Sequence, residues 1–379
     1  MKIVTAIDSF KGSMTSMEAG MAVAEGIHRV DETAEVIVRP LADGGEGTVE
    51  ALVEGMNGTR QEVTVTGPLG GQVVCEYGII ESSRTAVIEM AGAAGITLVP
   101  DAKRNPLETT TYGVGEVIKD AIKKGCRRFI IGIGGSATND GGIGMLQALG
   151  YDFLNQAGEQ VAYGAKGLKE LVKIDNAHVI PELKECKFLV ACDVTNPLCG
   201  ELGCSAIYGP QKGATPEMIR EMDQWLGAYA ALAAETFEKA DAGTPGTGAA
   251  GGLGFAFLTF TDAVLESGIQ IVLGETELEK YIKDADLVVT GEGRMDGQTA
   301  MGKAPVGVAR LAKKYGKPVV AFAGAVQRDA RACNEAGIDA FFPILRGVVT
   351  LEEAMENANA KRNLADTAEQ VYRLFGVRI

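Results

Sequence analysis

The sequence predicts an α/β fold, with a Rossmann-like parallel-sheet domain built from both chain ends and a second mixed α/β domain inserted in the middle. At both ends, apolar runs of strand length alternate with helical patterns, as in βαβ units. The central part instead alternates apolar and polar residues over short strands. The length of 379 residues also exceeds what a single hydrophobic core usually supports.

The amino-terminal part predicts a βαβαβ start. KIVTAI is an apolar run of strand length, and glycine, proline and aspartate separate the runs that follow it. The expected elements are strand 2–7, helix 15–29, strand 35–39, helix 46–56 and strand 60–66.

The carboxy-terminal part repeats this alternation, with Pro305 near the start of one helix. We expect the two chain ends to share one parallel sheet. The expected elements are strand 286–290, helix 303–314, strand 318–323, helix 328–336, strand 339–344 and a closing helix over 351–374.

The central segment predicts a small antiparallel sheet or barrel over 67–105 and 150–190, and helices over 111–124 and 216–240. The segment 243–254 is too glycine-rich for an ordinary connection, so it is interpreted as a hinge or another ligand loop. The predicted division is a Rossmann-like domain of residues 1–66 and 285–379 and an inserted domain of residues 67–284, with the active-site cleft between them.

Charge and cysteine content exclude several classes of protein. The formal net charge of −14, without a basic run, argues against nucleic-acid and membrane-surface partners. Seven cysteines without CxxC spacing indicate free thiols in a reducing compartment, so we expect a cytoplasmic protein. A zinc site is disfavoured because His28 and His178 are the only histidines. The oligomeric state stays open between monomer and homodimer.

The run GIGGSATNDGG, residues 132–142, follows an apolar strand and is the most informative segment. Its glycines allow backbone N–H groups to approach an anion closely, and the helix that follows adds its positive end. The alternative is a tight turn in which glycine only sets the backbone shape. The match to a dinucleotide fingerprint is disfavoured, because Thr138–Gly142 is poor helix material where that fingerprint opens directly into a helix.

Four further clusters combine glycine with charged or polar residues, and three of them directly follow a strand-like run. Ligands of open α/β sheets bind outside the carboxyl ends of strands, so one shared cleft is expected. The clusters are Asp8–Ser13, Asp43–Thr48, Asp193–Pro197 with Gln211–Gly213, and Gly291–Gln298.

The glycine-rich loops and their charged residues meet the requirements of phosphoryl transfer. Backbone amides and cations neutralise phosphates, carboxylates hold Mg²⁺, and one carboxylate accepts the proton of the attacking hydroxyl. Hydrolysis by a serine or cysteine triad is disfavoured because neither histidine lies in a polar loop. A carboxylate pair for glycoside chemistry stays open but leaves the basic residues unexplained.

The ordered motifs closely resemble those of the bacterial glycerate kinase family, type 1. They are IDSFKGS (7–13), PLADGGEGT (40–48), GIGGSATNDGG (132–142), ACDVTNPL (191–198), YGPQKGA (208–214), TGEGRMDGQT (290–299) and GKAPVGVA (302–309). The resemblance implies phosphorylation of D-glycerate by direct transfer from ATP with Mg²⁺, giving 2-phospho-D-glycerate. The alternatives are a 3-phosphate product, another small hydroxy acid, or a non-catalytic regulator that binds carboxylates or nucleotides.

On this interpretation Asp193 is the first candidate for general base, because it ends an apolar strand in a polar loop; it could instead cap a turn. Lys11 and Arg294 are candidates for phosphate or carboxylate contact, or are solvated surface charges. The Mg²⁺ candidates are Asp43, Glu46, Glu292 and Asp296. The candidates for binding glycerate or ATP are Asp8, Ser9, Ser13, Gly44, Gly45, Gly134, Gly135, Ser136, Asn139, Asp140, Thr195, Asn196, Lys212, Gly291 and Lys303; Asp8 could also hold the metal.

Overall fold

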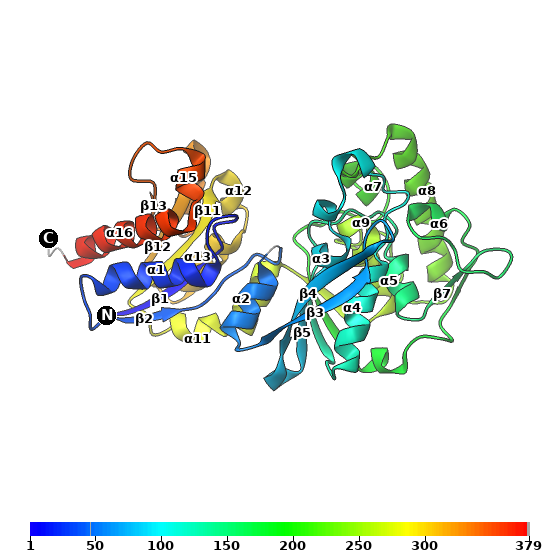
Figure 1. Ribbon diagram of the computed structural model, residues 1–379, viewed down its shortest axis with the longest axis horizontal. Helices are drawn as coiled ribbons and strands as arrows, with labels where there is room; N and C mark the ends of the chain where they lie inside the picture. The colour runs from blue at the N-terminus through cyan, green and yellow to red at the C-terminus, as the bar shows by residue number, and fades with distance from the viewer. Residues whose placement is uncertain (46, 377–379) are drawn as a thin grey trace. The chain divides into compact units, whose positions relative to one another are not determined.

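The apolar runs at the two chain ends form one parallel sheet in the computed structural model, which describes residues 1–45 and 47–376 (Figure 1). The chain divides into two units. The first contains Met1–Asp43, Glu50–Asn57 and the chain from Ile269 onward, and the second contains Gly44–Val49 and Gly58–Gly268.

The first unit is built on a five-stranded sheet in the order β13-β12-β11-β1-β2. Every pairing in it is parallel, and β1 from the amino terminus pairs with β11 from the carboxy-terminal part, which confirms the sheet predicted from both ends. The strands are β1 (Lys2–Ile7), β2 (Glu35–Val38), β11 (Leu287–Met295), β12 (Val319–Val326) and β13 (Ala340–Pro343).

The direction of the strand order reverses between β1 and β11. The chain adds β2 on one side of β1 and then β11, β12 and β13 on the other. This is a doubly wound sheet, in which the crevice for a ligand opens at the carboxyl ends of the strands beside the reversal. The predicted Rossmann-like class of this part is therefore confirmed, and its topology identifies where to look for a ligand.

Helices α1 (Ser16–His28) and α16 (Asn357–Gly376) pack against each other and against the same sheet face (Figure 1). α1 begins with a capping box between Thr15 and Glu18. α13 (Ala304–Lys314) contacts β11 and β1. The shorter helices are α2 (Thr48–Gly55), α10 (Gly268–Glu275), α11 (Leu278–Ile282), α12 (Gly297–Ala300), the 3₁₀ turn η6 (Arg328–Arg331), α14 (Ala332–Glu335) and α15 (Leu351–Met355).

The second unit is built on a six-stranded mixed sheet in the order β10-β9-β6-β5-β4-β3. The first four strands in this order are parallel, and β4 and β3 join them in antiparallel fashion. The bounds are β3 (Thr59–Thr66), β4 (Gln72–Ile80), β5 (Thr85–Glu89), β6 (Arg128–Gly132), β9 (Lys187–Ala191) and β10 (Ala263–Glu266). The predicted small antiparallel sheet is present as β7 (Asp152–Leu154) with β8 (Lys173–Asp175).

The strand expected over 60–66 forms, but it does not join the amino-terminal parallel sheet. As β3 it pairs with β4 through a tight turn in which Gly67 N donates to Gly71 O at 2.6 Å. Within the run TRQEVTVT, residues 60–65 alternate between exposed and less exposed positions, as in an antiparallel edge strand. The short hairpin connection therefore decides the partner of this strand.

The helices of the second unit surround an aromatic core that includes Tyr77, Phe129, Phe153 and Phe257. The predicted helix over 216–240 ends at Ala234. The helices are α3 (Ala91–Ala94), α4 (Tyr112–Lys123), α5 (Ile143–Ala148), α6 (Ala165–Leu168), α7 (Cys204–Tyr208), α8 (Pro216–Ala234) and α9 (Ala249–Phe260). The 3₁₀ turns are η1 (Glu81–Ser83), η2 (Ile96–Leu98), η3 (Asp101–Lys103), η4 (Pro181–Glu185) and η5 (Pro210–Lys212).

The glycine-rich segment 243–254 packs against the loop that follows β6. Gly251 O accepts a hydrogen bond from Gly141 N at 2.9 Å. The backbone of Gly251 is left-handed, at φ +68°, and a Cβ there would lie 2.0 Å from Thr138 O. Only glycine permits this approach, so the segment supports the shape of the loop 132–142.

Candidate active site

A cavity of about 430 Å³ lies in the first unit, where β1, β11 and β12 end. Its position beside the reversal of strand order is where doubly wound sheets bind ligands. It gathers residues from motifs that are far apart in the sequence. The predicted site residues that line it are Asp8, Ser9, Lys11, Ser13, Asp43, Glu292, Arg294 and Lys303.

Asp8 is the most buried carboxylate of this cavity, with an exposure of 5%. It directly follows β1, and its Oδ1 accepts a hydrogen bond from Ser9 N at 2.7 Å. Burial raises the pKa of Asp8 to about 7, and the charges of Asp43 and Glu292 also raise it, against the lowering by Ser9 N–H and Lys11. The carboxylates in the cavity therefore repel one another, and a cation would relieve that repulsion.

Glu292, near the end of β11, is 8% exposed, and its Oε1 accepts a hydrogen bond from Thr299 Oγ1 at 2.5 Å. Burial raises the pKa of Glu292, while Thr299 and Lys303 lower it. Thr299 was not predicted as a site residue. The available signal was its position in the TGEGRMDGQT motif, three residues after Asp296.

Three basic side chains line the same cavity. Lys11 is exposed, Lys303 is half-buried, and the side chain of Arg294 is 66% exposed with its Nε 3.4 Å from Asp296 Oδ2. Their exposure leaves them accessible to an anion in the cavity, so three of the four predicted basic residues, all except Lys212, are brought together here.

The carboxylates of Asp8, Asp43 and Glu292 fit Mg²⁺, which prefers oxygen donors and keeps several waters. No group of three or more His, Cys, Asp or Glu in residues 1–45 and 47–376 is arranged to hold a metal by itself. An ion that binds through one or two carboxylates and substrate phosphates is compatible with that arrangement.

The other two metal candidates differ in position from these carboxylates. Asp296 caps α12, since its Oδ1 accepts from Gln298 N at 3.0 Å, and it is not among the residues that line the cavity. The remaining candidate, Glu46, lies outside the described residues. The predicted ligand residue Gly291 lies inside β11, where a Cβ would lie 2.2 Å from Phe322 O, so it permits close strand packing.

A second group of predicted residues lies at the carboxyl edge of the parallel strands of the second unit. Gly44 packs there with φ +90°, and a Cβ would lie 2.8 Å from Ala191 Cβ at the end of β9. Gly45 follows it, and Gly134 and Gly135 are exposed in the loop after β6. Glu89, which ends β5 and accepts from Val49 N at 2.9 Å, was missed; its signal is a charge at the end of an apolar strand.

Asp193 lies two residues after β9 and is exposed. Its Oδ1 accepts a hydrogen bond from Gly268 N at 3.1 Å, at the start of α10. The carboxylate is therefore held at the carboxyl edge of this sheet while remaining accessible to solvent. A substrate hydroxyl could therefore come within hydrogen-bond reach of it, which is the first condition for a general base.

Asp140 is fully buried rather than open to a ligand. It accepts hydrogen bonds from Thr111 N at 2.8 Å, Thr111 Oγ1 at 2.9 Å and Gly142 N at 3.1 Å. Burial raises its pKa, against the lowering by these donors. The neighbouring Asn139 is also buried, and its Nδ2 donates to Ser205 Oγ at 2.8 Å. Both side chains hold the loop 132–142 in its conformation.

Lys212 is 2% exposed, and its Nζ donates to Ser136 Oγ at 2.8 Å and to Thr138 O at 2.6 Å. Burial lowers the pKa of Lys212 to about 8. It was expected in the basic lining, but the structure places it as a support of the loop. Asn196 has a similar supporting position, because its Nδ2 donates to Leu202 O and its Oδ1 accepts from Tyr208 OH. The neighbouring Thr195 is exposed.

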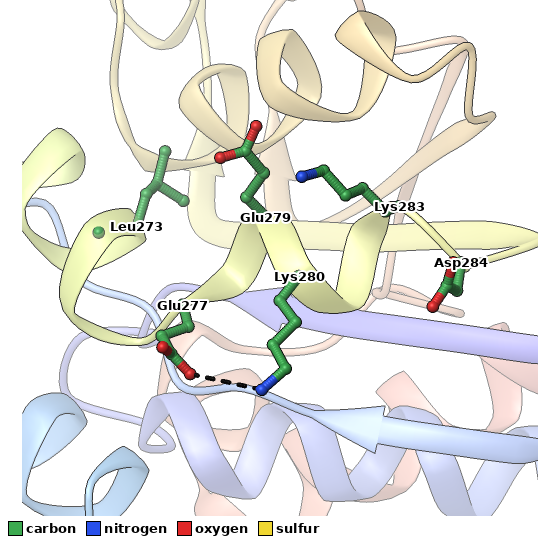
Figure 2. A pocket seen from close by; sticks show the side chains of 7 residues that line it. Leu273, Glu277, Glu279, Lys280, Lys283 and Asp284 are labelled. Carbon is green, nitrogen blue, oxygen red and sulfur yellow. Dashed lines mark ion pairs between the residues drawn. The ribbon is translucent and has the colours of Figure 1, made fainter.

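Another cavity of the first unit, of about 480 Å³, is formed around α11 (Figure 2). Three of its charged side chains are engaged nearby: Lys280 Nζ lies 3.9 Å from Glu277 Oε2, and Glu279 Oε1 accepts from Lys314 Nζ at 2.8 Å. It contains none of the motif residues. The candidate regions are therefore two, each described by itself: the cavity of about 430 Å³ in the first unit and the sheet edge that carries Asp193 in the second unit.

Residues 3–376 match the glycerate kinase family. The chain is 48% identical over 378 residues to a glycerate kinase of Haemophilus influenzae, covering 100% of both chains. It is 47% identical over 372 residues to a glycerate 2-kinase of Escherichia coli K12, covering 97% of this chain and 98% of the relative. A crystal structure of a candidate glycerate kinase 2 from Salmonella typhimurium LT2 superposes with a TM-score of 0.92 at 47% identity, covering 99% and 98% of the two chains. Within the described residues, no helix has the length and apolar character needed to cross a membrane.

Proposed function

Since the chain belongs to the glycerate kinase family, we propose that it transfers the γ-phosphate of ATP to the 2-hydroxyl of D-glycerate with Mg²⁺. The observation that carries the proposal is the cavity at the ends of β1 and β11, which combines basic and acidic side chains. The 2-hydroxyl is chosen because the relative from Escherichia coli is named glycerate 2-kinase.

The basic residues of the cavity bind the phosphates in this proposal. Lys11 and Lys303 supply ammonium charges, and Arg294 supplies a planar group that can hold two phosphate oxygens. Neutralising the phosphate oxygens lowers the barrier to attack by an alcohol, because the attacking oxygen is itself electron-rich. The exposure of these side chains supports the role.

One or two of the carboxylates Asp8, Asp43 and Glu292, together with the phosphates, would hold Mg²⁺. When bound, the ion neutralises charge on the phosphates and fixes their orientation. The support is the donor set, since three carboxylates share one cavity and their mutual repulsion contributes to the raised pKa of Asp8. Thr299 positions the carboxylate of Glu292 through its hydroxyl.

Asp193 accepts the proton of the glycerate hydroxyl as general base in this proposal. Its exposure supports the role, and the hydrogen bond from Gly268 N fixes one carboxylate oxygen. The exposed Gly134 and Gly135 lie on the loop after the neighbouring strand, where backbone N–H groups can bind the glycerate carboxylate.

The test is to incubate the protein with ATP, Mg²⁺ and D-glycerate and to identify the product by phosphorus NMR. We expect 2-phosphoglycerate. A 3-phosphate product would correct the position of transfer, and binding of ATP without any phosphorylated glycerate would favour another hydroxy acid or a binding protein.

The role of Asp193 is tested by Asp193→Asn. We expect kcat to fall by about 100-fold or more with little change in ATP affinity, because the amide cannot accept the proton. Asp262→Asn is the matched control, since Asp262 is an exposed carboxylate just before β10, paired with Lys239. An equal loss of activity in both variants would contradict the assignment.

A further inference from the structure

The cavity at the ends of β1 and β11 has an apolar wall in addition to its charged residues. The wall is formed by Ile344 and Leu345 after β13 and by Leu351, Ala354 and Met355 of α15. Three of its large side chains are exposed to solvent: Leu351 by 75%, Leu345 by 40% and Met355 by 37%. Single exposed apolar residues are ordinary, but a group of them around a cavity points to a ligand with apolar surface.

The apolar wall adjoins the loop that carries Lys11. A Cβ built on Gly12 would lie 3.0 Å from Met355 Cε, so the methyl group of Met355 reaches this loop. Asn357, at the start of α16, donates through Nδ2 to Ser13 O at 2.8 Å and to Glu18 Oε2 at 3.0 Å. These hydrogen bonds join the chain that follows the wall to the loop, so apolar and basic surfaces are presented together.

The start of α1 does not offer a separate phosphate site. Glu18 occupies it, since Glu18 Oε2 accepts from Thr15 N at 2.9 Å and Thr15 Oγ1 accepts from Glu18 N. A phosphate in this cavity therefore depends on the side chains of Lys11, Arg294 and Lys303.

A ligand that uses both surfaces has a highly charged end and a flat apolar end. Glycerate has an oxygen on each of its three carbons and gains nothing from leucine and methionine. A nucleoside triphosphate has both ends, and the thioether of methionine packs favourably against aromatic rings.

We propose that this cavity is the ATP site and that Leu345, Leu351 and Met355 bind the nucleotide base. The inference rests on the proposed function, which takes ATP as the phosphoryl donor and its phosphates as bound by Lys11, Arg294 and Lys303. It adds the contacts of the base.

The first experiment measures ATP binding by calorimetry and steady-state kinetics for Leu351→Gln. We expect the Kd and the KM of ATP to rise about tenfold, which corresponds to about 1.4 kcal/mol, because a polar side chain replaces an apolar contact. The KM of glycerate should not change. Val348→Gln is the matched control, because Val348 is fully exposed on the same segment but does not line the cavity.

Inorganic tripolyphosphate separates the base from the phosphates. It lacks a base, so its affinity should be equal in the wild type and in Leu351→Gln. A rise in the KM of glycerate instead, or an equal loss of tripolyphosphate affinity, would overturn the proposal.

A second measurement places the base directly. In protein labelled with ¹³C at methionine methyl groups, ATP should shift the Met355 resonance through the ring current of the base, and tripolyphosphate should not. An unshifted Met355 resonance at saturating ATP would overturn the proposal.

These outcomes are distinct from failure of the proposed function. A protein that binds ATP at this wall but does not phosphorylate glycerate contradicts only the proposed function. Full glycerate phosphorylation with unchanged ATP affinity in Leu351→Gln contradicts only the assignment of the base.

Discussion

Lys212 carries a buried ammonium group whose Nζ donates to Ser136 Oγ and Thr138 O. Nothing in the sequence distinguishes it from an exposed lysine, since it lies in the polar run QKG. Whether a lysine is buried depends on chain segments that are distant in sequence. The prediction for Lys212 used its residue type alone and was therefore a ligand contact. The same limit applies to Asp140, whose carboxylate is satisfied by Thr111 and Gly142.

The lowered pKa of Lys212 predicts a specific pH dependence of stability. Its pKa is about 8 in the folded protein against 10.5 ordinarily, so the unfolded chain binds more protons between these values. The stability of the wild type should therefore rise, relative to Lys212→Met, by up to about 3 kcal/mol as pH increases from about 8 to about 10.5. Below about 8 the difference should be constant.

Urea denaturation of both proteins across this pH range measures the effect. Lys166→Met is the control, because Lys166 is an exposed lysine paired with Glu108. A pH-independent difference between the wild type and Lys212→Met would show that Lys212 titrates normally.

Replacing Asp8 and replacing Asp296 should have different effects on the Mg²⁺ concentration that activity requires. Asp8→Asn should raise the free Mg²⁺ needed for half-maximal activity by about tenfold or more, because a donor of the cavity is lost. Asp296→Ala should leave that requirement unchanged and instead lower stability by about 1 kcal/mol, since Asp296 caps α12.

Activity measured against free Mg²⁺, together with thermal denaturation, checks both variants. If Asp296→Ala alone raised the Mg²⁺ requirement, the carboxylates proposed for the metal would have to be reassigned.

At the scale of elements, local periodicity predicts most strands and helices, because each βαβ unit carries its own pattern. The pattern within a strand does not determine which strand it pairs with. β3 was expected in the parallel sheet but pairs with β4 across a tight turn. The closing helix is interrupted at Glu356, where the backbone turns extended before Asn357 binds the loop of Ser13. Such a contact across the chain leaves no periodic signal in the sequence.

The packing of segment 243–254 against the loop 132–142 predicts a costly substitution. Gly251→Ala adds a Cβ 2.0 Å from Thr138 O, at a left-handed φ of +68°. Gly158→Ala is the matched control, because Gly158 has φ +79° and nothing within 4 Å of a Cβ. The control should lose about 1 kcal/mol of unfolding free energy from backbone strain alone.

Gly251→Ala should lose about 2 kcal/mol more than the control, because a crowded contact is added to the same strain. Chemical denaturation measures the difference. Equal losses of unfolding free energy in the two variants would mean that segment 243–254 moves to accommodate the Cβ without loss of stability. In that case it does not hold the loop 132–142 in its conformation.

At the scale of the whole molecule, each unit has its own core, and the predicted site residues gather at the carboxyl edge of one sheet in each. The sequence identified those motifs because glycine and charge at strand ends are visible in a linear pattern. It did not separate them by unit, since the chain enters the second unit within the DGGEG motif, after Asp43.

All seven cysteines are free thiols distributed over both units, which predicts how the native molecule reacts with a thiol reagent. Five are buried, and Cys192 and Cys199 are half-buried. Burial raises the pKa of Cys199 and of Cys75 to about 12, so thiolate is scarce at neutral pH even where the sulfur is partly accessible.

With Ellman's reagent at pH 7.5, we therefore expect slow modification of at most Cys192 and Cys199 in the native protein, and fast modification of all seven cysteines in guanidinium chloride. Unfolding without a reducing agent should give the same number of reactive thiols. In a separate thermal denaturation, a reducing agent should not lower the Tm, because none of the seven cysteines forms a disulfide. Fast native reaction of a buried thiol such as Cys333 would mean that α14, which carries it, opens more readily than its packing indicates.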